Sequence, residues 1–206
     1  MKTSLQLPKT LRLAQREDLP ADTPESMFDE ISNNNVIEGY KLHYNDNNPE
    51  HSELPFNFFS EINVDNSRLW DLVLLLSEDL PEVVSLIFGH IDHKPTYGKY
   101  VNKEYLLDFL SKYIKEFTQD TFIFFGLIYN DNSKFVEVFI DESKYIKYWG
   151  TDELAFRANL SKFYLNEIDN LNFVDEYPKV RESLNYLDEE AISSNDLINL
   201  LKSEFE

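Results

Sequence analysis

The chain of 206 residues contains no cysteine. This absence excludes disulfide bonds, thiolate metal ligands, iron–sulfur clusters and thiol nucleophiles, and it fits a reducing compartment. Glycine is scarce as well, with only five residues, at positions 39, 89, 98, 126 and 150. No two of them are close enough for a phosphate-binding loop or a dinucleotide-binding fingerprint, and no G-x-S-x-G motif occurs. The sequence therefore predicts no cofactor, and it excludes the enzyme classes that depend on these motifs.

Long hydrophobic runs are also missing. The longest, at 72–76 and 122–128, are far shorter than the roughly 20 residues that span a bilayer. Lys9, Arg12 and Arg16 interrupt the N-terminal segment, so it lacks the hydrophobic core of a signal peptide. We therefore expect a cytoplasmic protein that does not contact membranes.

Basic residues are the scarcer charged class, with 19 Lys and Arg against 38 Asp and Glu, and the net charge is −19. This charge repels the phosphates of nucleic acids, so we expect no direct binding of nucleic acid. The charge is uneven, because residues 17–61 and 163–206 are strongly acidic whereas 62–162 is only mildly acidic. We expect the two acidic regions to supply most of the surface that meets a partner.

The sequence does contain enough apolar residues to form a folded core. Hydrophobic residues make up 42% of the chain, with 16 Phe and 12 Tyr, and the length suits one domain better than two. Residues 1–35 are predicted to form a basic N-terminal arm and an acidic, loop-rich lead-in, with one short helix near Glu25 to Ile31. Residues 36–206 are predicted to form a single domain.

The strands are predicted from period-two alternation and from short apolar runs. These patterns indicate about five strands, at 36–44, 83–92, 121–129, 134–141 and 144–149. Turn-forming residues connect the last three strands, which should form an antiparallel meander. We expect the last of them, 144–149, to lie near an edge of the sheet.

Apolar stripes at helical spacing predict amphipathic helices over 67–76, from 102 to 117, after Gly150 and at the C-terminus. Thr151 is expected to cap the third of these helices, and Ser194 or Asn195 the last. The predicted fold class is therefore α+β, an antiparallel β-meander sheet packed by amphipathic helices.

Histidines are candidates for a general base or a metal ligand. His90 and Asp92 share one face of a predicted strand, and His43 lies on another strand, so the three could converge on one site. The alternative is that they lie at strand ends or in the loop through His93, as ordinary surface or hydrogen-bonded side chains.

An oxygen-rich loop is a further candidate. Asp46, Asn48 and Glu50 have a spacing that hints at calcium ligands, but His51 occupies the sixth position, where the calcium loop of an EF-hand requires glycine. The same residues follow a predicted strand, where a turn is needed. We therefore predict a turn here and no metal site.

An acidic surface with many aromatic side chains remains as the strongest clue to function. Tyr and Trp supply much of the binding energy at protein interfaces, and complementary charge raises the association rate. Such a surface suits a basic protein partner. The predicted partner-binding residues are Asp141, Glu142, Tyr145, Tyr148, Trp149, Asp175, Glu176 and Tyr177.

These observations favour a non-enzymatic protein of the inhibitor or immunity type, which binds and neutralises a basic partner such as a bacterial toxin or nuclease. Such an inhibitor needs a stable scaffold, a charged face and no chemistry of its own. The alternatives are a regulatory or assembly adaptor, and an enzyme that uses His90 and Asp92. An acidic surface can also serve solubility alone.

Overall fold

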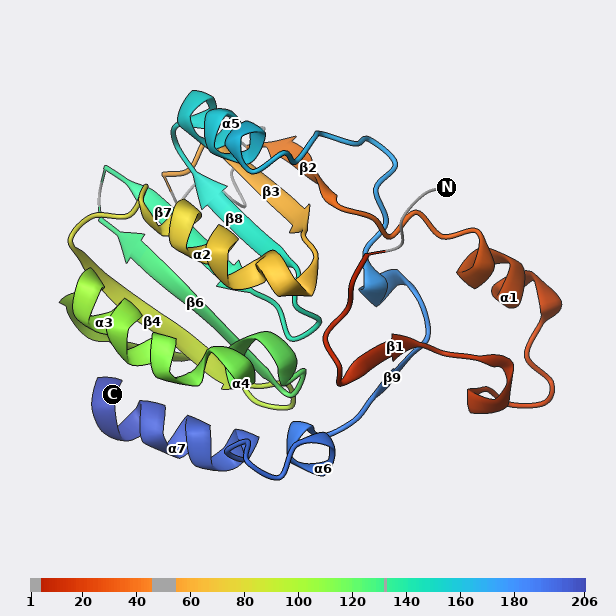
Figure 1. Ribbon diagram of the computed structural model, residues 1–206. Helices are drawn as coiled ribbons and strands as arrows, with labels where there is room; N and C mark the ends of the chain where they lie inside the picture. Colours follow the sequence, from red (N-terminus) through yellow and green to blue (C-terminus); the bar gives the residue numbers. More distant parts are fainter. Residues whose placement is uncertain (1–4, 46–54, 132) are drawn as a thin grey trace.

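The main body of the protein is a seven-stranded antiparallel sheet with helices packed on one side (Figure 1). The computed structural model describes residues 5–45, 55–131 and 133–206, so the predicted turn at 46–51 lies outside the described residues. The strands run in the order β2-β3-β8-β7-β6-β4-β5. They are β2 (Gly39–Tyr44), β3 (Phe58–Asn63), β4 (Val83–His90), β5 (Thr96–Asn102), β6 (Ile123–Asn130), β7 (Phe135–Ile140) and β8 (Ile146–Gly150).

The α+β class and the antiparallel meander β6-β7-β8 are confirmed, but the sheet has seven strands instead of about five. The sequence patterns missed β3 and β5. β5 is a largely exposed edge strand with a glycine, and its pairing with β4 is irregular between Ser85 and Ile87, so it carries no clean alternation.

The expected position of β8 near an edge of the sheet is wrong. β3 pairs along its other side, with Phe59 opposite Trp149 and Ile62 opposite Ile146, so β8 is an interior strand. This pairing joins segments that are far apart in the sequence, so no local sequence pattern predicts it.

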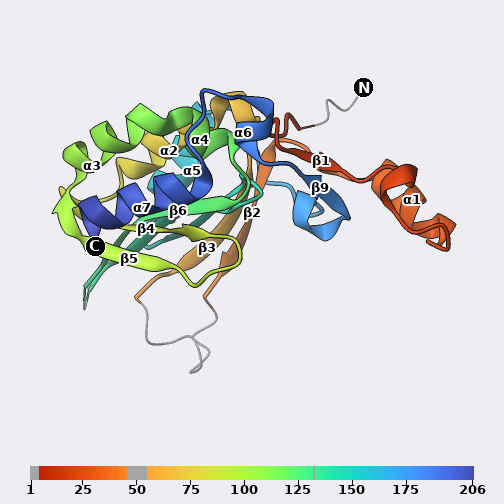
Figure 2. The ribbon, with the colours of Figure 1, turned by 90° about the horizontal axis from the view of Figure 1, so that it is seen from below.

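The helices that cover the sheet all lie over the same face (Figures 1 and 2). They are α2 (Leu69–Ser77), α3 (Lys103–Leu110), α4 (Ile114–Gln119), α5 (Glu153–Lys162) and α7 (Ser194–Phe205). The single helix expected from 102 to 117 is α3 followed by α4, with a 3-10 turn at Ser111–Tyr113 between them.

Two predicted caps are displaced by one residue. Asp152, and not Thr151, caps α5 by accepting a hydrogen bond from the Ala155 amide at 3.0 Å. Ser193, and not Ser194 or Asn195, caps α7 by accepting from the Asp196 amide at 3.2 Å. In both cases the neighbouring residue has the better-placed oxygen for the free amides of the first turn.

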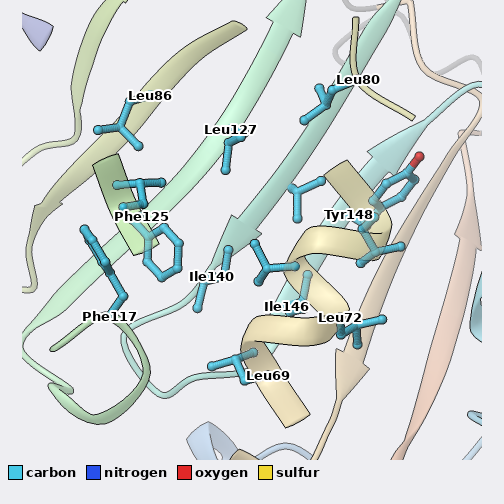
Figure 3. Packing of buried hydrophobic residues seen from close by; sticks show 14 of the residues in the cluster. Leu69, Leu72, Leu80, Leu86, Phe117, Phe125, Leu127, Ile140, Ile146 and Tyr148 are labelled. Carbon is cyan, nitrogen blue, oxygen red and sulfur yellow. The ribbon is translucent and has the colours of Figure 1, made fainter. Parts of the chain in front are cut away.

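The core lies between the sheet and these helices. Leu69 and Leu72 of α2 and Phe117 of α4 face strand residues such as Phe125 and Tyr148 (Figure 3). This layer contains the largest buried cluster of the described chain. This core determines which face of each strand points toward the helices. The opposite face of the sheet is left without a helical cover within the described chain.

A smaller unit stands beside the sheet (Figure 1). It contains the short helix α1 (Glu25–Ser32), close to where the sequence predicts one, and a two-stranded sheet of β1 (Leu11–Leu13) and β9 (Lys179–Arg181). Part of the basic arm is thus paired with a segment near the C-terminal end of the chain. The short helix α6 (Leu184–Leu187) links β9 to α7. Within the described ranges, no helix has the length and apolar character needed to cross a membrane.

Candidate functional site

The structure divides the predicted partner-binding residues between a charged cluster at the β7–β8 turn and the two faces of β8. Asp141 and Glu142 lie at that turn, and Asp175 lies in a 3-10 turn (Val174–Glu176) packed against it. Oxygen atoms of Asp141, Glu142 and Asp175 all lie within 4.8 Å of one another. The sequence analysis grouped Asp141, Glu142 and Asp175 among the partner-binding residues, and these three do lie together in the structure. No local sequence pattern predicts this contact.

Cations of the same chain face this acidic cluster. Lys147 Nζ lies 2.7 Å from Asp141 Oδ2, and Lys179 Nζ lies 2.5 Å from Asp175 Oδ1. Arg181 Nη2 lies 3.5 Å from Glu142 Oε1. We call these six residues the turn cluster. Because each carboxylate has an internal cation, the turn cluster ties β9 and its preceding segment to the sheet.

The pKa values of the turn cluster follow from burial and pairing. Burial opposes ionisation of Asp175, but hydrogen bonds from Lys179 and Ser143 outweigh it and lower the Asp175 pKa. Burial and the nearby charge of Asp141 raise the pKa of Glu142. Burial also lowers the pKa of Lys144, in the same turn, to about 8. The turn cluster is an internally compensated ion network, so its carboxylates are poor candidates for direct partner contact.

The other predicted residues of this region have structural contacts. Glu176 accepts hydrogen bonds at 2.8 Å from the Asn172 side chain and from the Phe173 amide, which closes the 3-10 turn. Tyr145 is 6% exposed and packs against Phe173 with ring centroids 4.9 Å apart. Tyr177, which follows the turn, is half-buried.

The neighbours Tyr148 and Trp149 point to opposite faces of the sheet, as successive residues of a strand must. Tyr148 is 2% exposed, belongs to the core and donates a hydrogen bond to Asp79 Oδ2 at 3.1 Å. Trp149 lies on the other face, where its ring centroid is 4.7 Å from that of Phe59. Of the two residues, only Trp149 is placed to meet a partner.

Trp149 belongs to a face of the sheet that no helix of the described chain covers (Figure 2). We call it the open face. One row across it runs His43, Phe59, Trp149, Glu137, Ile128 and Ser85, and the next runs Lys41, Glu61, Lys147, Phe139, Gly126 and Ile87. The two rows therefore combine aromatic rings, at Phe59, Trp149 and Phe139, with charged side chains, at Lys41, Glu61, Lys147 and Glu137.

Glu137 is the unusual residue of the open face. Its neighbours in the row are Trp149 and Ile128, and none of the described residues gives its carboxylate an ion pair or a hydrogen bond. Burial raises the pKa of Glu137 to about 7. A carboxylate that has lost much of its water and has gained no partner is a costly arrangement, and it favours the arrival of a cation.

The cost of this carboxylate can be measured with Glu137→Gln. The pKa of Glu137 rises from 4.5 to about 7 on folding, so its ionisation opposes folding increasingly as the pH rises through that window. Removing the charge should raise the free energy of unfolding by about 1–3 kcal/mol at pH 8, after allowance for partial exposure. At pH 5.5 the gain should be less than half as large. Urea denaturation at both pH values measures it.

Glu189→Gln is the matched control, since Glu189 is exposed. It should leave the free energy of unfolding unchanged at both pH values. If Glu137→Gln instead lowers stability at pH 8, the carboxylate has a stabilising partner and its description as unpaired is wrong.

The residues of the possible catalytic cluster do not converge. His43 is on the edge strand β2, and four strands separate it from His90 on β4. At about 4.8 Å per strand, the two histidines are roughly 24 Å apart. His90 Nδ1 lies 3.9 Å from Asp92 Oδ2, which is beyond hydrogen-bond reach. The three side chains therefore do not form the common site on which the enzyme hypothesis was built.

Sequence reasoning missed the most distinctive residues of the open face, Phe59, Glu137 and Phe139. A signal was present, because Phe135, Glu137 and Phe139 alternate with Val136, Val138 and Ile140. Both sets are rich in apolar side chains, so the alternation alone does not say which set the helices cover. The chain matches no protein-family model, no curated protein and no solved structure.

Proposed function

We propose that this chain is a non-enzymatic protein of the inhibitor or immunity type, which binds and neutralises a basic protein partner through the open face. The observation that carries the proposal is the unpaired Glu137 carboxylate among aromatic side chains, on a sheet face without a helical cover in the described chain.

The chemistry of the open face suits an arginine or lysine side chain of a partner. Glu137 offers a carboxylate that is already partly desolvated, so an incoming cation gains more than it would at an exposed acid. The flanking Trp149 offers a π-face to the same cation, and Tyr97, which follows Ile87 in the second row, is 63% exposed. Aromatic anchors around one buried charge pair are the composition of an interface hot spot.

The cations already on the open face do not cancel this preference. Lys147 is held by Asp141 at 2.7 Å, and Lys41 lies over the Phe173 ring at 5.6 Å from its centroid. Both therefore belong to the end of the face near the turn cluster. The net charge of −19 adds a long-range attraction for a basic partner, which salt should weaken.

The function can be tested with the product of the open reading frame that adjoins this gene, produced with and without the chain. The neighbouring product should arrest growth when produced alone, and the chain should bind it and restore growth. Trp149→Ala should weaken binding about 30–100-fold, because it removes the central aromatic anchor. Calorimetry at two salt concentrations measures the affinity.

Tyr186→Ala is the control variant, since Tyr186 is 88% exposed and lies on α6, away from the open face. It should bind and protect like the unchanged chain. Binding without protection from growth arrest would indicate an adaptor instead of an inhibitor. No binding of the neighbouring product, or equal loss in both variants, would contradict the proposal.

A further inference from the structure

A second feature lies on the other side of the molecule from the open face. A groove of about 310 Å³ lies between α7 and the loop that joins β4 to β5. We call it the α7 groove. Its lining residues are Gly89, His90, His93, Lys94, Thr96, Asn195, Ile198, Asn199 and Lys202.

The charge of the α7 groove is opposite to that of the whole chain. It is lined by two lysines and two histidines and by no acidic residue, in a chain with 38 acidic and 19 basic side chains. Asp92 is the carboxylate beside it, but its side chain is 80% exposed and its oxygen is 3.9 Å from His90. A local excess of positive charge is needed before an anion can approach so acidic a protein.

The two lysine side chains that line the α7 groove have no ion-pair partner among the described residues. Within the described parts of the chain, neither the Lys94 nor the Lys202 ammonium group forms an ion pair or a hydrogen bond. Lys115 and Lys179, in contrast, are held by carboxylates at 3.1 and 2.5 Å. With acidic residues in twofold excess, two unpaired lysines that share one groove are free to serve a ligand.

The polar side chains of α7 are arranged along the groove. Asn195, Asn199 and Lys202 follow one another at spacings of four and three residues, which places them on the same side of the helix. Both asparagine side chains lack hydrogen bonds within the described chain, so each amide can donate to a ligand oxygen. Thr96, on β5, adds a hydroxyl to the lining of the groove.

We propose that the α7 groove binds a small anion with at least two negative charges, of the phosphate-ester or polycarboxylate class. Its volume is at the lower end of the range for small-molecule sites, which fits a compact ligand. Two ammonium groups, amide donors and a hydroxyl match the oxygens of such a ligand. A nucleic acid fits the groove poorly, because the net charge of −19 would repel its further phosphates.

Inorganic pyrophosphate and citrate are the probes that test this inference on the full chain. Each is titrated into the isotope-labelled protein, and amide chemical shifts are followed by NMR. Saturable shifts confined to residues 93–96 and 195–202 are expected for at least one probe. A response to pyrophosphate alone assigns a phosphoryl ligand, and a response to citrate alone assigns a polycarboxylate.

The double variant Lys94→Gln/Lys202→Gln should raise the dissociation constant of the responding probe at least about tenfold, since it removes two charged donors. The double variant Lys9→Gln/Lys99→Gln changes the net charge equally, outside the groove, and should change the constant less than about twofold. Asn199→Asp, which adds a negative charge to the groove, should also weaken binding.

Two results would overturn the inference. One is the absence of saturable shifts with either probe up to about 10 mM, where even weak sites of this kind fill. The other is equal loss of affinity in the two double variants, which would show that only the net charge matters. Thermal unfolding of each variant verifies that the fold is retained, as expected for exposed lysines.

Discussion

Phe58→Ala is expected to lower the free energy of unfolding by about 3–5 kcal/mol. Phe58 is fully buried on the helix side of β3, where its ring centroid lies 5.0 Å from that of Phe156 and 5.8 Å from that of Tyr148. Truncation leaves a cavity between the sheet and α5 that these large rings cannot fill. Urea denaturation measures the loss, and Phe58→Leu, which keeps part of the volume, should cost about 1–2 kcal/mol.

Phe59→Ala is the matched control, because Phe59 follows in sequence but lies on the open face. Its ring contacts Trp149 and His43, and its removal should cost only about 1 kcal/mol of stability. It should instead weaken binding of the partner about tenfold, whereas Phe58→Leu should leave binding intact. Equal losses of stability in the two alanine variants would contradict the register of β3.

Asp120→Ala is expected to cost about 2–4 kcal/mol. The Asp120 side chain is 1% exposed and connects three elements at the end of the sheet. Its carboxylate accepts a hydrogen bond from Ser194 Oγ at 2.6 Å and another from the Phe122 amide at 2.9 Å. It also offsets the buried charge of Lys144. Its removal leaves both donors without this acceptor and takes away one of the negative charges near Lys144, whose ammonium still donates to the Ile123 carbonyl at 2.8 Å.

The contribution of charge can be separated from that of hydrogen bonding by Asp120→Asn and by pH. Burial lowers the pKa of Lys144 to about 8, so its ammonium is charged in the folded protein below that pH and neutral above it. Asp120→Asn should therefore destabilise the protein more at pH 7 than at pH 9.5. Ser194→Ala, which removes one hydrogen bond and no charge, should cost about 1 kcal/mol at both values. A loss that does not change with pH would assign the role of Asp120 to hydrogen bonding alone.

The sequence predicted those parts of the fold in which neighbours in the chain are neighbours in space. β6, β7 and β8 are joined by short turns, so alternation and turn residues were sufficient to predict the meander. β3 pairs with β8, and β1 with β9, across long stretches of the chain, and local sequence patterns do not indicate such partners. For this reason β8 was expected near an edge of the sheet, and part of the basic arm was not expected to pair with β9.

The candidate surface was predicted only in part, and the reason is again that contacts between distant segments leave no local sequence pattern. Acidic and aromatic residues at the β7–β8 turn could be recognised in the sequence, but the cations that neutralise them could not. Lys179 and Arg181 reach the turn cluster from β9, which is far along the chain. Conversely, Glu137 has no signal in composition, because it is one acid among many. Only the three-dimensional arrangement shows that its carboxylate stands alone among apolar side chains.

The pairing of β3 with β8 has a consequence for the protein while it is being made. The β2–β3 hairpin leaves the ribosome well before β8, which begins at Ile146. Phe58 and Ile62 therefore lack their partners on β8 until that strand has been synthesised. At about 5–20 residues per second, this delay lasts several seconds. During that time an unpaired, phenylalanine-rich strand edge is open to other nascent chains. The N-terminal half of this protein therefore depends on prompt completion of the C-terminal half, and translational pauses before Ile146 should increase aggregation.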